Sequence, residues 1–213
     1  TEIIDNSVDE ALAGFAHNVW ITISLDNSVS VIDDGRGIPV DEMPQYKKSA
    51  LEIVMTKLHA GGKFGGRAYK VSGGIHGVGA SVVNALSEWA KVFVFREGKV
   101  WTQEYSRGKP KGKVQPAGSR DLDGLAKVKN GTATIFLPDR QIFPNIELDF
   151  EVLKKTVRER AYLVPKLYFH LVDLRGDEIK EVNYYFEGGI KSLIEKLNDN
   201  KGKQHDVIYI NRH

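Results

Sequence analysis

The chain has 213 residues, 41% of them hydrophobic, which suits one substantial core and the usual size of a single domain. Its 30 basic and 28 acidic residues leave a formal net charge of +2, so the overall charge gives no reason to expect a nucleic-acid or membrane surface. The sequence has no cysteine, which excludes disulfides and thiolate metal sites, and no apolar run of the roughly 20 residues that span a bilayer. We therefore expect one domain over residues 1–213, in a soluble cytoplasmic protein.

Both ends of the chain have the pattern of a fragment of a longer protein. Helical periodicity begins at Thr1 with no capping residue before it. At the other end, the chain stops three residues after the strand-like segment Val207–Ile210.

The first segment has the apolar spacing of one helical face. The residues at that spacing are Ile4, Val8, Ala11, Leu12 and Phe15. At 100° per residue, Glu2, Asn6 and Asp9 fall on the opposite face. This polar stripe faces either solvent or a pocket, and the helix considered alone favours solvent.

Alternating and helical patterns divide the rest of the chain into strands and helices. The expected strands are Val19–Leu25, Val29–Ile32, Ala90–Phe95, Val100–Tyr105, Thr132–Leu137, Leu167–Leu174 and Lys180–Phe186. The further expected helices are Ala50–His59, Val78–Glu88, Phe150–Ala161 and Ile190–Leu197. Residues 60–79 are glycine-rich and predict a long mobile loop, and residues 106–130 predict a variable loop. The fold class that follows is a two-layer α+β sandwich, in which a mixed, mostly antiparallel sheet carries helices on one face.

Several common nucleotide and metal motifs do not occur in the sequence. No window matches the Walker pattern Gly-x-x-x-x-Gly-Lys-Ser/Thr. The dinucleotide fingerprint fails because Val82 stands where its third glycine is needed. The histidines have no metal-ligand spacing, so a zinc hydrolase is unsupported.

The segment Gly73–Gly79 can bring backbone N–H groups close to an anion at the start of the helix expected from Val78. Lys63 and Tyr69 lie upstream and could close over the same phosphates as a lid, and His76 could donate to them. The alternatives are a glycine hinge without a ligand and an ordinary exposed lysine.

Asp33 ends a predicted strand and is followed closely by Gly35 and Gly37. A buried carboxylate at this position can accept a hydrogen bond from an adenine amino group, while the glycines let a flat base lie against the backbone. The alternative is a plain turn, because Asp and Gly are favoured in turns for local reasons.

Glu2 and Asn6 lie one helical turn apart on the polar face of the first helix. A carboxylate there can deprotonate water, and an amide oxygen can coordinate Mg²⁺, which takes few protein ligands and completes its shell with phosphates and water.

The order of these motifs resembles the GHKL ATPases, which have the Bergerat nucleotide fold. The stretches Ile4–Gly14, Asp33–Pro39, Leu58–Phe64 and Ser72–Gly79 are most similar to the ATPase domain of bacterial type IIA topoisomerases, found in the B subunits of DNA gyrase and topoisomerase IV. The resemblance extends more weakly through Tyr185–Ile190 and so covers nearly the whole chain.

The resemblance implies a role for each matching residue, with ATP and Mg²⁺ as cofactors. Glu2 matches the general base, Asn6 the Mg²⁺ ligand, and Asp33 the adenine-binding carboxylate, helped through water by Thr132. The lid and phosphate cradle match Lys63, Tyr69, Gly74, Ile75, His76, Gly77, Val78, Gly79 and Ala80. The rim where aminocoumarin inhibitors bind matches Arg36, Pro39 and Arg96.

The same resemblance implies partners: the DNA-cleaving A subunit of gyrase or topoisomerase IV, a second copy of the ATPase protein, and duplex DNA in the full complex, with no membrane. The exchanged N-terminal arm and the transducer domain of the family have no counterpart in this sequence. We therefore expect nucleotide binding to survive in the chain and dimerisation and turnover to be poor.

Two other functions remain open at this point. A sensor-type histidine kinase domain would transfer phosphate instead of hydrolysing ATP and would need no role for Glu2. A non-catalytic module could bind DNA through residues 107–113, or through Lys154, Lys155, Arg158 and Arg160, although such charge runs are usually solvated faces.

Overall fold

The computed structural model describes residues 1–58, 78–122, 125, 128–202 and 204–210. Its helices are α1 (Glu2–Leu12), α2 (Ala50–Thr56), α3 (Gly79–Ala85), α4 (Phe150–Leu163) and α5 (Ile190–Leu197), with a 3₁₀ turn at Ser119–Leu122. Its strands are β1 (Asn18–Ile23), β2 (Val29–Asp33), β3 (Glu42–Met43), β4 (Lys48–Ser49), β5 (Ser87–Arg96), β6 (Lys99–Ser106), β7 (Lys109–Pro110), β8 (Gln115–Pro116), β9 (Gly131–Pro138), β10 (Tyr168–Asp173) and β11 (Lys180–Tyr184).

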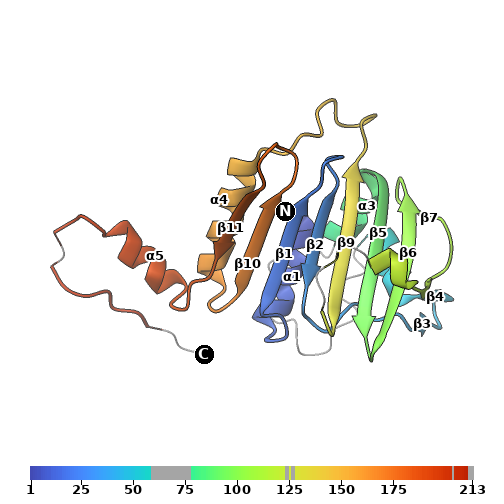
Figure 1. Cartoon of the computed structure of the whole chain (residues 1–213). Coiled ribbons are helices and arrows are strands. Elements are labelled where there is room, and N and C mark those ends of the chain that lie inside the picture. Colours follow the sequence, from blue (N-terminus) through green and yellow to red (C-terminus); the bar gives the residue numbers. More distant parts are fainter. Residues whose placement is uncertain (59–77, 123–124, 126–127, 203, 211–213) are drawn as a thin grey trace.

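Nine of the described strands form one twisted sheet in the order β11-β10-β1-β2-β9-β5-β6-β7, with β8 also paired to β6 (Figure 1). β1 and β10 run parallel, and the other described pairs in this sheet are antiparallel. β3 and β4 form a separate short hairpin. The sheet is therefore mixed and mostly antiparallel, as the sequence predicts.

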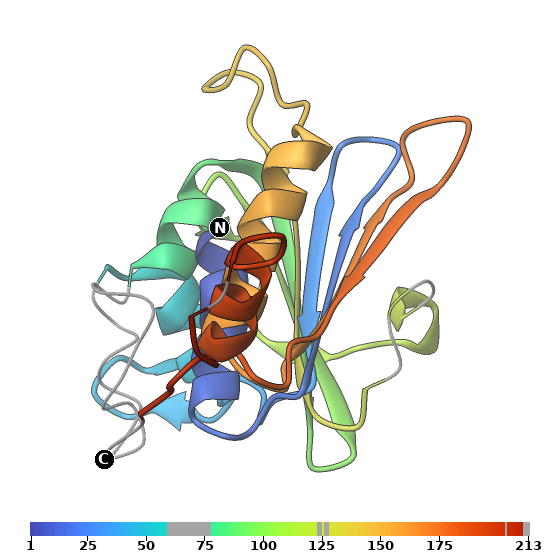
Figure 2. The ribbon, with the colours of Figure 1, turned by 90° about the vertical axis from the view of Figure 1, so that its left-hand side faces the viewer.

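The helices gather on one face of the sheet (Figure 2). The main core lies between the two layers and takes apolar side chains from both, including Ile4 and Val8 of α1, Val31 of β2 and Val157 of α4. α1 contacts β2 and α3, and α4 contacts β10 and β11. This arrangement confirms the two-layer sandwich with helices on one face.

The opposite face of the sheet holds a smaller apolar cluster. Ile32, Phe93, Phe95 and Ala133 form it, and the side chains of Ala117, Leu122, Leu125 and Val128 pack over them. Because side chains alternate between the two faces of a strand, Val31 belongs to the main core while Ile32 belongs to this cluster. The segment 106–130, predicted as a variable loop, contains β7, β8 and the 3₁₀ turn.

Two predicted helices are too long. α2 ends at Thr56 instead of His59, because Lys57 is already extended, and His59 lies outside the described residues. α3 ends at Ala85 and β5 begins at Ser87, so the helix predicted to Glu88 is wrong at its end. Pairing of Ser87 with Pro138 of β9 replaces the last predicted turn of helix.

Three side chains also differ from the predicted pattern of α1. Leu12 and Phe15 are exposed by 43% and 42%, although their spacing predicts burial. Asp9 is buried, although its position predicts the polar face. Phe15 is exposed because α1 ends at Leu12, before this residue. For Leu12 and Asp9, packing of α1 against both β2 and α3 shifts the buried face of the helix relative to the simple periodicity.

Among the residues that the structure describes, no helix is long and apolar enough to cross a membrane.

Candidate nucleotide-binding site

Asp33 is the last residue of β2 and is buried on the helix side of the sheet. Three donors from separate segments reach its carboxylate. The Ser7 hydroxyl donates to Oδ2 at 3.1 Å, the Gly35 N–H donates to Oδ1 at 3.0 Å, and the Thr132 N–H donates to Oδ1 at 3.4 Å. These contacts fix the carboxylate in one orientation at the edge of the β2–β9 pair.

Burial raises the pKa of Asp33 to about 6. The Glu10 carboxylate nearby adds to this rise in the pKa, while the hydrogen bonds from Gly35, Ser7 and Thr132 oppose it. A buried carboxylate with a pKa near neutrality is more typical of a binding or catalytic site than of a plain turn. The Gly35 contact is the local bond that the turn interpretation expects, whereas the donors from Ser7 and Thr132 come from distant segments and go beyond a plain turn.

Gly131 lets β9 approach the backbone of Asp33. Its φ is +142°, and a side chain at residue 131 would collide with the Asp33 carbonyl oxygen. The next residue, Thr132, pairs directly with Asp33 across the two strands. The Thr132 hydroxyl accepts a hydrogen bond from the Ile38 N–H at 3.2 Å, so its own hydrogen can point at a ligand or a water.

Glu2 and Asn6 lie exposed on α1, and Glu2 lies against the first residue of α3. A Cβ atom at Gly79 would lie 2.7 Å from Glu2 Oε2 and 3.1 Å from Glu2 Cβ, so a side chain there would push the Glu2 side chain aside. Val78 precedes the helix, and Ala80 is buried in the main core. The structure thus brings the predicted general base to the described end of the predicted phosphate cradle.

The predicted rim residues gather around the segment that follows Asp33. The Arg36 guanidinium forms a two-point ion pair with Glu10 and lies 3.8 Å from the centre of the Phe15 ring. Arg96 Nη1 donates to the Gly37 carbonyl oxygen at 3.3 Å. Pro39 follows in the same segment and is half-buried.

Six of the predicted site residues lie outside the described residues. They are Lys63, Tyr69, Gly74, Ile75, His76 and Gly77.

The family described as "Histidine kinase-, DNA gyrase B-, and HSP90-like ATPase" matches residues 1–139, which is more than half of the chain. The chain belongs to this ATPase family. The match includes the described residues that bind Asp33, together with Glu2 and Gly79.

Within this family, the chain is similar to the B subunits of DNA gyrase. The B subunit of DNA gyrase from Borreliella burgdorferi is 48% identical over 98% of this chain and 32% of that protein. The same protein from Thermotoga maritima is 49% identical over 99% of this chain and 32% of its own length. The crystal structure of the 43K ATPase domain of Thermus thermophilus gyrase B in complex with an aminocoumarin matches with a TM-score of 0.80 and 38% identity, over 96% of this chain and 50% of that one. The chain therefore spans about a third of the length of these curated relatives.

Sequence reasoning missed one residue that holds Asp33 and one that holds the neighbouring strand. Ser7 is a polar residue beside Val8 on the apolar face of α1, and that mismatch was the available signal. Asp34 accepts hydrogen bonds from the His17 N–H and from both the backbone and the side-chain amide of Asn18. It therefore fixes the start of β1, while its neighbour Asp33 faces the site.

Three cations of the proposed DNA-binding runs form ion pairs within the protein. Arg107 pairs with the buried Asp139, Lys154 with Glu151, and Arg160 with Asp5. These pairs are typical of a solvated face.

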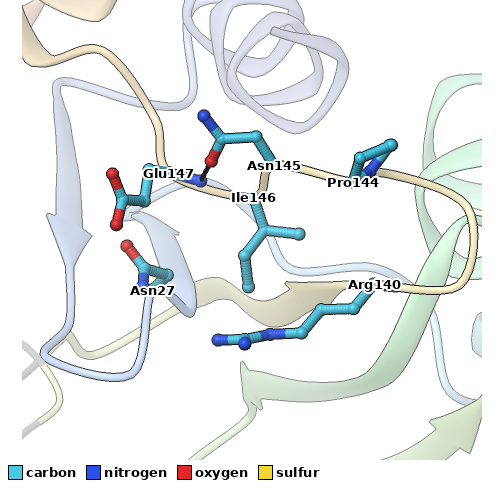
Figure 3. Close-up of a pocket in the computed structure, with 6 residues that line it drawn as sticks. All are labelled: Asn27, Arg140, Pro144, Asn145, Ile146 and Glu147. Carbon is cyan, nitrogen blue, oxygen red and sulfur yellow. Dashed lines mark hydrogen bonds between the residues drawn. The ribbon is translucent and has the colours of Figure 1, made fainter.

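A hollow of about 180 Å³ lies elsewhere on the surface (Figure 3). Its lining comes from the turn before β2 and from the segment between β9 and α4, and includes Asn27, Arg140 and Glu147. Since Asn27 precedes β2 and Asp33 ends it, the hollow and the candidate site lie at opposite ends of the same strand.

Proposed function

We propose that the chain binds ATP with its adenine amino group on Asp33 and its phosphates at the start of α3. The observation that carries this proposal is the buried Asp33 carboxylate, held by donors from α1, the β2 end and β9. A carboxylate has about four acceptor positions, and described residues use three of them. The remaining position suits one N–H donor from a base, as an amino group provides.

Hydrolysis would follow from the neighbouring groups. Glu2 deprotonates a water that attacks the terminal phosphate, since its carboxylate lies at Gly79, where the cradle enters α3. Asn6 is exposed one turn further along α1 and offers an amide oxygen, which is a donor that Mg²⁺ accepts alongside phosphates and water. Bound Mg²⁺ would neutralise charge on the phosphates.

The remaining site roles rest on the family resemblance, and those of Thr132, Arg36, Pro39 and Arg96 also on the geometry above. We assign a water-mediated base contact to Thr132 and an inhibitor-binding rim to Arg36, Pro39 and Arg96. We assign the lid and the rest of the cradle to Lys63, Tyr69 and the segment from Gly74 to Ala80.

At the level of the whole protein, we propose that residues 1–213 are the ATPase domain of a type IIA topoisomerase. This enzyme would act in the cytoplasm. ATP binding would close two copies of the ATPase protein on each other and drive the passage of one DNA duplex through another, together with the DNA-cleaving A subunit of gyrase or topoisomerase IV. The similarity to the B subunit of gyrase over nearly the whole chain supports this proposal.

Calorimetric titration with a non-hydrolysable ATP analogue, with and without Mg²⁺, tests the proposal. The parent chain should bind the analogue, and Asp33→Asn should weaken binding by about tenfold or more, because an amide presents a donor where a charged acceptor is needed. Gly112→Ala is the matched control, since a Cβ at that exposed glycine meets no described atom within 4 Å. Equal affinity of the parent and Asp33→Asn would reject the assigned base contact.

A further inference from the structure

We propose that Ser7 is a positioning residue that orients Asp33 and thereby sets the preference of the site for an amino-bearing purine. This inference rests on the proposed function, because it concerns how the same site selects its base. Ser7 lies on α1, is 2% exposed, and donates its hydroxyl hydrogen to Asp33 Oδ2 at 3.1 Å.

The two oxygens of Asp33 are held in different ways. Oδ1 accepts from the backbone N–H groups of Gly35 and Thr132, so any residue that keeps the backbone in place keeps those bonds. Oδ2 instead accepts from a side chain, and among the described residues the donor is the Ser7 hydroxyl. A single substitution at residue 7 can therefore release Oδ2 while leaving Oδ1 held.

The surroundings make this hydroxyl important for the carboxylate. Glu10, one helical turn further along α1, contributes a second negative charge, and the described groups near Asp33 that counter it are dipoles and not cations. Glu10 itself is paired with Arg36. Ser7 thus supplies one of the few hydrogen bonds that favour the charged, base-binding form of Asp33.

The consequence concerns base selection. With Ser7 occupying one lone pair of Oδ2, the other keeps a fixed direction, towards which an adenine amino group can donate. Hypoxanthine has a keto oxygen at the same place. That oxygen and the Asp33 carboxylate are both hydrogen-bond acceptors, so no hydrogen bond would form between them. Without the hydroxyl, the carboxylate can rotate or take up a proton, and a protonated carboxyl can donate to that keto oxygen.

The experiment compares Ser7→Ala with the parent chain, using ADP and inosine diphosphate as probes in calorimetric titrations at pH 7.5. Ser87→Ala is the matched control, because Ser87 is also 2% exposed and its hydroxyl donates to a helix carbonyl, that of Val83, away from Asp33. The titration midpoint of the Asp33 side-chain carboxyl is followed by ¹³C NMR in all three proteins without ligand.

Ser7→Ala should weaken ADP binding by about fivefold, change binding of inosine diphosphate by less than about twofold, and raise the Asp33 midpoint by about one pH unit. Ser87→Ala should leave both the ratio of affinities and the midpoint as in the parent. A purely structural role of Ser7 would instead lower both affinities together, and that result would overturn the inference.

An unmoved Asp33 midpoint in Ser7→Ala would also overturn it, because the hydrogen bond would then not favour the charged form. Failure of the proposed function looks different: the parent chain itself would show no preference for ADP over inosine diphosphate.

Discussion

Burial of Asp33 links base binding to protonation at the level of a single residue. Its pKa is raised to about 6 in the folded chain, against an ordinary value of 3.8. The folded state therefore binds this proton more tightly than the unfolded state does. As far as this group is concerned, the ligand-free protein gains stability as the pH falls from about 6 to about 4, and ionisation opposes folding above pH 6.

Adenine binding should show the opposite trend with pH. A charged carboxylate accepts the amino hydrogen better than a neutral one, so ADP binding should weaken by about tenfold between pH 7 and pH 5, through the pKa near 6. Calorimetry in two buffers of different ionisation enthalpy should detect release of a proton on binding at pH 5.5. Inosine diphosphate carries the same phosphates and is the control, and an unchanged ratio of the two affinities across this range would contradict the prediction.

Gly79 provides a second test at the residue scale. In a full-length protein, Gly79→Ala should lower the rate of ATP turnover by about 10², because the added methyl group displaces the Glu2 carboxylate from the start of α3. Steady-state ATPase assays measure the effect, and Gly112→Ala, where the structure leaves open space, should retain the parent rate. Equal rates for Gly79→Ala and the parent would show that Glu2 does not need its observed position.

At the scale of elements, the junction of β2 and β9 holds the Asp33 carboxylate in place. Asp33 pairs with Thr132, and this register requires the close approach of Gly131 to the Asp33 backbone. A change in this junction should disturb the sheet and the site together.

Gly131→Ala should therefore destabilise the chain by about 3 kcal/mol, since it combines an unfavourable φ with a backbone collision. Gly98→Ala should cost only about 1 kcal/mol, because Gly98 also has a positive φ, +72°, but a Cβ there meets no described atom within 4 Å. Urea unfolding of both variants gives the comparison. Similar losses would mean that the collision at Gly131 relaxes without effect.

The order of elements follows from sequence periodicity better than their ends do. Helix α5 has its predicted bounds, Ile190–Leu197, because its apolar spacing is regular and it competes with no neighbouring strand. The boundary of α3 with β5 was wrong because pairing of Ser87 with β9 decides it, and Pro138 lies 51 positions further along the chain. Local patterns do not contain that information.

In the candidate site, too, local sequence patterns indicate some features while others depend on long-range packing. Glu2, Asn6, Asp33 and the glycine-rich segments were each weak signals alone, and their order along the chain carried the family resemblance that implied their roles. The contact of Ser7 with Asp33 depends on how α1 lies against β2, so it follows only from the folded structure.

At the scale of the whole molecule, the candidate site lies apart from two other surfaces. The helix face carries Asp33 and Glu2, while the smaller apolar cluster, around Phe93 and Phe95, lies on the opposite face. The hollow next to Asn27 lies at the far end of β2. A ligand bound at either of those places would not reach the groups that the proposed function needs.

A crystal structure of the chain grown with a non-hydrolysable ATP analogue and Mg²⁺ tests this placement most directly. The account predicts the adenine amino group within hydrogen-bond distance of Asp33 Oδ2, with the triphosphate running towards Gly79 and Glu2. An analogue bound elsewhere on the sheet, with the Asp33 carboxylate still held by Ser7 and no base beside it, would contradict the account.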